Sequence, residues 1–297
     1  MQFLRSYFIE LILMGVLLAA VLFFGYLGYG LLSPQLTAQT FSGEAAFVAV
    51  EEQLAFGPRT TGSEASIAAS DWMTQTLRDL QWRVIIQPYD MTVPEVVVSE
   101  AISDTQTTSL SSLTTVRARN IVAVRSPSNL ADDVTPPVAL VVAPYDSRLV
   151  ADGDQTRAPS PGANVGGSGA AILLELAATL DLELSGHTVC LAFLDSEANR
   201  GLPGWQPPFG GHVLIEEIED GDPDLIECAD PRVVVVLEAV GGNNHRILYD
   251  PASNSSVSNA IWQTAAALEF DDQFVPSIGQ PMPGPHNTFV EAGYATA

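Results

Sequence analysis

Lysine is absent from this chain of 297 residues, and all 12 of its basic side chains are arginines. Because 35 residues are acidic, the formal net charge at pH 7 is −23. This charge argues against nucleic acid and against anionic lipid headgroups as partners of the main domain, since both carry phosphate. The acidity is typical of a solubility feature and by itself assigns no binding site.

Cysteine and histidine are also scarce, with two and four residues. Cys190 lies in an apolar, strand-like run and Cys228 just before another, which favours two buried free thiols. A disulfide between them is the alternative outside the cytoplasm. Three of the histidines lie at element boundaries without partners at ligand spacing, and are interpreted as ordinary surface or core residues: His187, His212 and His245.

Long apolar runs are rare, but residues 11–32 (LILMGVLLAAVLFFGYLGYGLL) carry no charge. At about 1.5 Å per helical residue, this run spans a hydrocarbon core of roughly 30 Å, which predicts a transmembrane helix. A cleaved signal peptide is the alternative, although its apolar core is typically about 7–15 residues and no A-x-A-like site follows here. Arg5 precedes the run, which favours a cytoplasmic N-terminus (residues 1–10) and an extracytoplasmic main domain after a linker (33–40).

Beyond the linker, apolar residues alternate between helical and strand-like spacing. Helical spacing predicts helices over 41–56 and 63–80, with Ser42, Ser63 and Ser66 as candidate caps. Further along, strands are predicted over 83–91, 94–102, 118–126, 138–143, 187–195 and 233–240, and helices near 168–181 and 211–219. Continuous apolar strands that alternate with helices indicate a sheet buried on both faces. We therefore expect residues 41–297 to form a three-layer α/β sandwich around a mostly parallel, mixed sheet.

Seven sequence blocks carry a family resemblance through their order: GPRTTGS (57–63), ARNIVAV (118–124), APYDS (143–147), SPGANVGGSGAAILLELA (160–177), LAFLDSEANRG (191–201), VVLEAVGG (235–242) and PHNTFVEAGYATA (285–297). Together they resemble the zinc aminopeptidase and glutaminyl cyclase family, which includes aminopeptidase Y-like exopeptidases. The resemblance covers residues 43–297 and implies the family's fold. It also implies a domain that is short at its C-terminal end, because family members continue past the strand that GYATA matches.

The resemblance also implies where metal would be held, since the family's strand ends supply imidazole and carboxylate ligands to a zinc pair. Here the ligand positions fall on Pro144, Val165 and Ala198, which offer no donor atom, and on Glu238, where the family has aspartate. The last histidine ligand has no counterpart, because His286 matches a different block. We therefore expect neither zinc nor another cofactor in a degenerate member of the family.

One functional position has the same residue type as the family. Glu197 matches the family's general base, here a vestigial one, while Asp146, Glu238 and His286 leave a residual polar cleft. Simpler interpretations remain open: Glu197 could be a carboxylate at a solvated loop end with no cation nearby, and Asp146 could cap a turn.

These losses favour a membrane-anchored aminopeptidase-like domain without zinc or catalysis, acting as a scaffold, a binding module or an accessory subunit of a membrane complex. The alternative is an active metal-dependent aminopeptidase or glutaminyl cyclase that holds one ion in the residual polar cleft, with Glu197 as base. Two other hypotheses fit less well. A serine hydrolase would need a histidine base near Ser168 or Ser196, and PGANVGGSG matches neither nucleotide-binding spacing.

Overall fold

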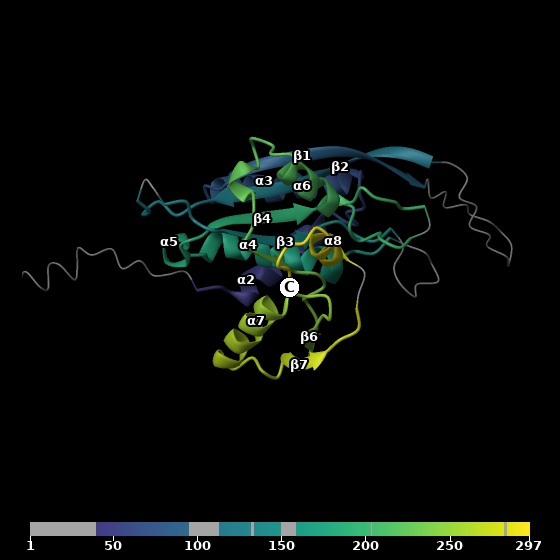
Figure 1. Cartoon of the computed structure of the whole chain (residues 1–297). Helices are drawn as coiled ribbons and strands as arrows, with labels where there is room; N and C mark the ends of the chain where they lie inside the picture. The colour runs from purple at the N-terminus through teal and green to yellow at the C-terminus, as the bar shows by residue number, and fades with distance from the viewer. Residues whose placement is uncertain (1–39, 95–112, 132–133, 150–158, 203, 282–283) are drawn as a thin grey trace, which may run out of the picture. The chain divides into compact units, whose positions relative to one another are not determined.

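A computed structural model of the chain describes residues 40–94, 113–131, 134–149, 159–202, 204–281 and 284–297 (Figure 1). The predicted membrane span, residues 11–32, lies outside these residues, and so does all but the start of the strand predicted over 94–102. Within the described ranges, no helix has both the length and the apolar character needed to cross a bilayer. Residues 40–297 form one compact unit.

A mixed, five-stranded sheet with the strand order β1-β2-β4-β3-β5 lies at the centre of this unit. Its strands are β1 (Arg83–Pro94), β2 (Leu113–Arg125), β3 (Val138–Pro144), β4 (Thr188–Leu194) and β5 (Val233–Val236). β2 is antiparallel to both β1 and β4, whereas β4, β3 and β5 run parallel to one another. The carboxyl ends of these three parallel strands meet at one edge, where open α/β sheets bind their ligands.

Helices cover both faces of the sheet (Figure 1). One face carries α3 (Glu64–Asp79), α4 (Gly169–Thr179) and α5 (Leu182–Ser185), and the other carries α6 (Gly210–Glu219) and α8 (Pro285–Glu291). A further helix, α2 (Gly43–Ala55), packs against α4. The predicted mixed α/β sandwich is confirmed.

The alternation of side chains along β2 shows why the sheet needs both layers. Ile121 and Ala123 pack in the core beneath α3 and α4, while Val122 and Val124 pack in the core beneath α6. All four side chains are buried. A strand that buries both faces reads as a continuous apolar run in the sequence, which is what allowed its prediction.

The two first helices begin where their capping residues predict. The Ser42 hydroxyl accepts a hydrogen bond from the Ala45 N–H, and the Ser63 hydroxyl accepts one from the Ser66 N–H. Each bond satisfies one of the N–H groups that a first helical turn leaves without an internal partner. Ser66, the other candidate cap, lies inside α3.

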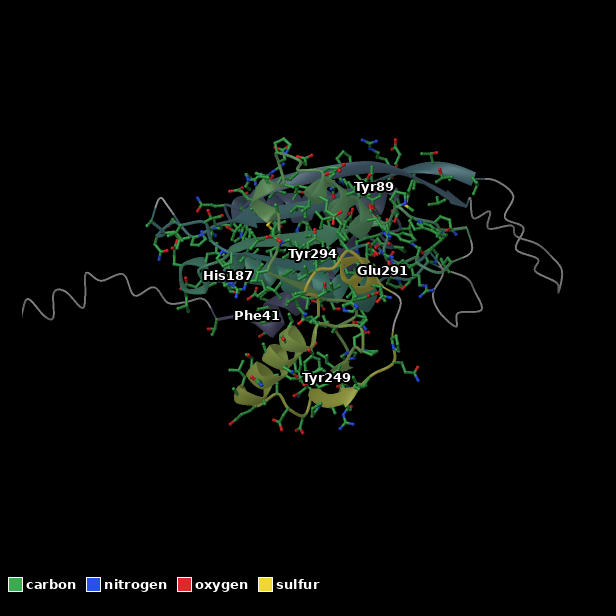
Figure 2. The ribbon with its side chains drawn as sticks, in the orientation of Figure 1. Phe41, Tyr89, His187, Tyr249, Glu291 and Tyr294 are labelled. Carbon is green, nitrogen blue, oxygen red and sulfur yellow. A yellow bond between two sulfur atoms is a disulfide. The ribbon has the colours of Figure 1, made fainter. Side chains whose placement is uncertain are left out.

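The C-terminal part contains elements that the sequence did not predict. β6 (Ile247–Tyr249) and β7 (Phe274–Ile278) form a small parallel sheet, which packs with α7 (Ser255–Ala267) to one side of the main sheet (Figure 1). In that packing, the Trp262 ring stacks on Tyr249 at 4.3 Å between ring centres, and Figure 2 marks the position of Tyr249. The final residues return to β5, where the Ala297 N–H donates to the Val234 carbonyl.

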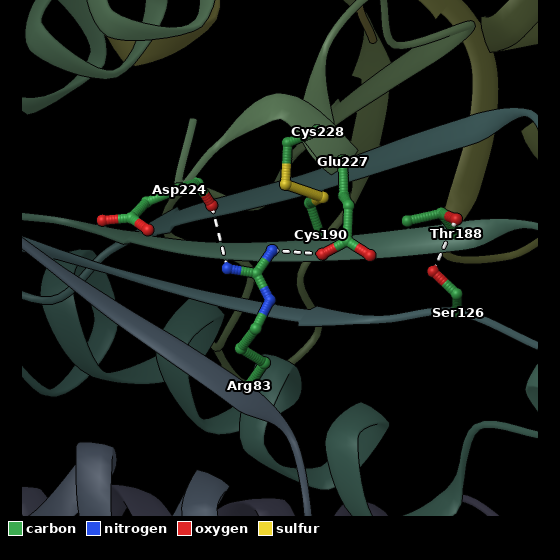
Figure 3. Close-up of a disulfide and its surroundings, with 7 residues drawn as sticks. All are labelled: Arg83, Ser126, Thr188, Cys190, Asp224, Glu227 and Cys228. Carbon is green, nitrogen blue, oxygen red and sulfur yellow. Dashed lines mark hydrogen bonds and ion pairs between the residues drawn. A yellow bond between two sulfur atoms is a disulfide. The ribbon is translucent and has the colours of Figure 1, made fainter. Parts of the chain in front are cut away.

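Cys190 and Cys228 form a disulfide, with their Cα atoms 6.0 Å apart (Figure 3). This corrects the prediction of two free thiols. Cys190 lies in β4, and Cys228 ends the short 3-10 helix η2 (Ile226–Cys228), which packs over β4 on the α6 side. The apolar runs around each cysteine predicted burial correctly, but they carried no information that the two buried positions face each other.

Candidate functional site

The segment after β3 is tied to the segment after β4 by a buried carboxylate. Asp146 is fully buried, and its Oδ1 accepts hydrogen bonds from the backbone N–H groups of Glu197 at 3.0 Å and Ala198 at 3.1 Å. Its Oδ2 accepts from the same Ala198 N–H at 3.0 Å. Burial, with the neighbouring charges of Asp195 and Glu197, raises the pKa of Asp146 well above its usual value. Asp146 therefore ties two strand ends together with both of its oxygens.

Glu197 is buried beside a cation, which rules out the alternative interpretation of a carboxylate at a solvated loop end. Its side chain is 0% exposed, and its Oε2 forms an ion pair with the Nε of Arg200. The other oxygen, Oε1, accepts a hydrogen bond from the Gly211 N–H at the start of α6, at 2.8 Å. A Cβ added to Gly211 would lie 3.2 Å from this oxygen, so a glycine at this position leaves room for the carboxylate.

Arg200 connects this carboxylate to α8. Its Nη2 donates to the Thr288 hydroxyl at 2.8 Å, and its guanidinium carbon lies 4.4 Å from the centre of the Phe209 ring. Arg200 was not among the predicted site residues. Its position three residues after Glu197 was the available signal, but that spacing indicates contact only within a helix, and these residues form a turn.

Glu238 follows β5 and lies near the same ion pair. Burial, and after it the charge of Glu197, raise its pKa from 4.5 to about 7, although the charge of Arg200 opposes both effects. The loop before α8 approaches this carboxylate closely, since a Cβ added to Gly284 would lie 2.1 Å from the Glu238 Oε2. The structure thus brings Asp146, Glu197 and Glu238 to one region of the sheet edge.

Two left-handed residues border these acids. Ser196, before Glu197, has a φ of 62°, and Ala239, after Glu238, has a φ of 51°. For a residue other than glycine this conformation costs about 1–2 kcal/mol, and such residues gather at functional sites. The backbone at both strand ends therefore adopts a conformation that costs free energy, as is common at functional sites.

His286 does not join these acids. It lies near the start of α8, where its Nε2 is 3.1 Å from the Ser253 hydroxyl and its Nδ1 is 3.3 Å from the Asn287 side-chain oxygen. In the ranges that the structure describes, no three His, Cys, Asp or Glu side chains are arranged to hold a metal ion. Of the predicted polar cleft, the structure therefore assembles the carboxylates without the imidazole.

A buried arginine, Arg59, connects the segments near these acids through hydrogen bonds to their carbonyls. Arg59, from the GPRTTGS block, donates through Nε to the Tyr145 carbonyl at 3.1 Å and through Nη2 to the Gly162 carbonyl at 2.9 Å. Its Nη1 donates to the carbonyls of Gln53 and Pro161, each at 3.2 Å. Burial lowers its pKa to about 10, so the guanidinium stays charged at neutral pH. One side chain thus fixes the end of α2, the end of β3 and the glycine-rich loop.

A second buried carboxylate, Asp195, directly follows β4. The Asp195 Oδ1 accepts from the Thr61 hydroxyl at 2.9 Å and from the Ser196 N–H at 2.8 Å, while its Oδ2 accepts from the Tyr145 hydroxyl at 3.0 Å. The Tyr89 hydroxyl, in β1, donates to the Asp195 carbonyl at 3.0 Å (Figure 2). These bonds explain how Ser196 is held in its left-handed conformation.

The sequence pattern of peptidase family M28 matches residues 120–297, more than half of the chain. The chain belongs to peptidase family M28. The match includes every position at which the family resemblance implied a metal ligand, and the earlier GPRTTGS block supplies Arg59 beneath them. The predicted family is thereby confirmed.

Solved structures share the fold of this M28 chain. A Zn-dependent exopeptidase from Parabacteroides distasonis matches with a TM-score of 0.67 at 21% identity, covering 88% of this chain and 84% of that one. A glutaminyl cyclase from Porphyromonas gingivalis matches with a TM-score of 0.68 at 24% identity, covering 86% and 82%. A leucine aminopeptidase precursor from Bacteroides thetaiotaomicron matches with a TM-score of 0.64 at 20% identity, covering 88% and 85%. No curated protein sequence matches the chain.

The residues of this M28 chain do not fit zinc. Pro144 ends β3, Val165 lies in the turn η1 (Ala163–Ser168) and Ala198 follows Glu197, and none of these side chains carries a donor atom. A zinc site needs at least three protein ligands. Of the remaining acids, Asp146 is bonded to backbone N–H groups and Glu197 to Arg200. No step of a metal-dependent reaction can be derived from this set.

Replacing Glu238 with glutamine is expected to stabilise the protein more at pH 8 than at pH 5. Folding raises the pKa of this group from 4.5 to about 7, so the wild type loses stability as pH rises through that interval and stays less stable above it. The wild type loses at most about 3 kcal/mol of unfolding free energy in this way, at about 1.4 kcal/mol for each unit by which the pKa is raised. Urea unfolding at both pH values measures it, with the exposed Asp90→Asn as the control. Equal pH dependence in the wild type and E238Q would contradict the prediction.

Proposed function

We propose that this M28 chain is a non-catalytic, metal-free member of its family that serves as a scaffold or binding module at a membrane. One observation carries the proposal: three ligand positions have lost their donor atoms, and the carboxylate at the general-base position is bonded to Arg200 instead. A base must be free to accept a proton from water or substrate. The ion pair with Arg200 and the hydrogen bond from Gly211 engage both oxygens of Glu197.

The membrane part of the proposal places the domain outside the cytoplasm, anchored by residues 11–32, with residues 1–10 inside. The uncharged run and the position of Arg5 support this orientation. The Cys190–Cys228 disulfide supports it as well, because structural disulfides persist in oxidising compartments. In this position the domain would act as an accessory subunit that other membrane proteins bind.

Metal content and activity test the loss of catalysis. We expect the full chain, purified in mild detergent, to contain no stoichiometric zinc by elemental analysis, either as isolated or after incubation with zinc and desalting. We also expect no turnover of aminopeptidase or glutaminyl cyclase substrates, with or without a chelator. One tightly bound zinc per chain together with chelator-sensitive turnover would overturn the proposal.

Extraction from native membranes tests the accessory role. In mild detergent, we expect a tagged full chain to migrate as a complex larger than its detergent-bound monomer. A chain that lacks residues 1–39 is the control, and it should not assemble into that complex if the anchor is required. Recovery of the full chain only as a monomer would argue against an accessory subunit.

A further inference from the structure

Four carboxylates gather at the strand ends. Asp146, Asp195 and Glu197 are almost completely buried, and Glu238 is half-buried. Burying a carboxylate is costly unless a cation, a proton or several hydrogen bonds compensate it. Asp146 and Asp195 each receive hydrogen bonds from surrounding N–H and O–H groups. Among the residues that the structure describes, Glu197 receives one such bond, from Gly211, and its other partner is Arg200.

The surroundings of Arg200 hold its positive charge in a fixed place inside the fold, and we call this side chain the built-in cation. Its side chain is only 16% exposed, and it touches three groups from different segments: the Glu197 carboxylate, the Thr288 hydroxyl and the face of Phe209. A guanidinium suits this place better than an ammonium, because it is planar, donates in several directions and stacks on aromatic rings. The ion pair between Arg117 and Asp90 differs from it, because these two side chains are 61% and 60% exposed.

We infer that Arg200 provides from within the chain the positive charge that this fold otherwise takes from a metal ion, and that it closes the former metal site by tying the loop after β4 to α8. The inference rests on the proposed function, because it requires that no metal compensate Glu197. It adds a specific role: Arg200 is a positioning residue that holds Glu197 and Thr288 together. The folded state should then be insensitive to divalent cations and sensitive to Arg200.

Thermal unfolding of the full chain in mild detergent tests this role, with Arg117→Ala as the matched control. Arg200→Ala leaves the Glu197 charge buried without its partner, so we expect the melting temperature to fall by roughly 6–12 °C. Arg117→Ala removes an exposed ion pair and should lower it by no more than about 2 °C. Neither zinc nor chelator should move the wild-type melting temperature.

Two rescue measurements separate a cation requirement from a simple loss of packing. First, the double variant R200A/E197Q removes the unpaired charge and should regain more than half of the lost melting temperature. Second, millimolar guanidinium chloride, far below denaturing concentrations, should raise the melting temperature of R200A but not that of R117A, with equal sodium chloride as the ionic-strength control. Arg200→Lys should show a smaller loss than R200A, since it keeps the charge but not the bond to Thr288.

The outcomes distinguish this inference from the proposed function. A metal-free wild type in which R200A melts like R117A would overturn only the role of Arg200, and so would failure of E197Q to restore R200A. A wild type that binds one zinc per chain and melts higher with it would overturn both. The built-in cation would be established if R200A of a metal-free protein has a much lower melting temperature and if both E197Q and guanidinium restore it.

Discussion

Replacing Arg59 with leucine is expected to lower the free energy of unfolding by on the order of 5 kcal/mol, because several buried carbonyls lose their donor and each costs about 1–3 kcal/mol. The carbonyls are those of Gln53, Tyr145, Pro161 and Gly162, in three separate segments. Native domains are stable by only about 5–15 kcal/mol, so the variant should be near the limit of folding.

The geometry around Arg59 shows why the loop that it contacts needs a glycine at position 162. Gly162 has a φ of 71°, and a Cβ there would lie 2.5 Å from the Cβ of Ser147, so the loop can approach the guanidinium only through glycine. The Ser147 N–H in turn donates to the Arg59 carbonyl at 3.0 Å. Arg59 therefore sets the path of the chain directly after β3, where Asp146 begins the candidate site.

Urea unfolding of the full chain measures the Arg59 effect, with R59K beside R59L. Lysine keeps the charge, but one ammonium cannot reach carbonyls spread around a planar fork, so R59K should recover only part of the loss. Arg117→Ala, an exposed arginine, serves as the control and should change stability by about 0–1 kcal/mol. A difference of less than about 1 kcal/mol between R59L and the wild type would refute the role assigned to the buried guanidinium.

Local patterns predicted the elements that carry a strong physical signal in the sequence. Ser42 and Ser63 mark the helix starts because a serine hydroxyl satisfies a free N–H wherever the chain folds next. The continuous apolar runs of β2, β3 and β4 identify strands buried on both faces. The sequence alone also shows that the side chains of Pro144 and Val165 have no donor atom for a metal.

The unpredicted features depend on contacts between segments far apart in sequence. The contact between Arg200 and Thr288 joins residues 88 positions apart, and the sequence carries no period that relates them. His286 matched a family block, but its ring direction follows from α8 packing beside Ser253. The sequence left the burial of Glu197 open, because that burial comes from α6, which begins at Gly210 and places the Gly211 N–H against it.

The site combines left-handed backbone turns with side chains that do not fit zinc. Ser196 and Ala239 adopt left-handed conformations beside Glu197 and Glu238, although glycine would relieve that strain. Single side-chain substitutions can remove a ligand without moving the backbone, whereas the strained turns are fixed by networks such as that of Asp195. A change of donor atoms can therefore leave the fold in place, so the fold by itself does not assign the chemistry of this site.

The C190A/C228A double variant is expected to lose about 4 kcal/mol of unfolding free energy, which is the loop-closure value for a crosslink of this span. The two cysteines are 38 positions apart, and the loop between them contains all of α6. The crosslink holds η2 against β4 and so limits the freedom of that loop in the unfolded chain. Both side chains are fully buried, so removal of the sulfur atoms also leaves a small cavity.

Urea unfolding with and without reductant separates the crosslink from the cavity. If the crosslink dominates, reductant should lower wild-type stability close to that of C190A/C228A and should leave the double variant unchanged. Because α6 supplies the Gly211 N–H to Glu197, loosening this loop should also weaken the ion pair with Arg200. We therefore expect R200A to cost less in the C190A/C228A background than in the wild type. Strict additivity of the two changes would show that the disulfide and the built-in cation stabilise the fold independently.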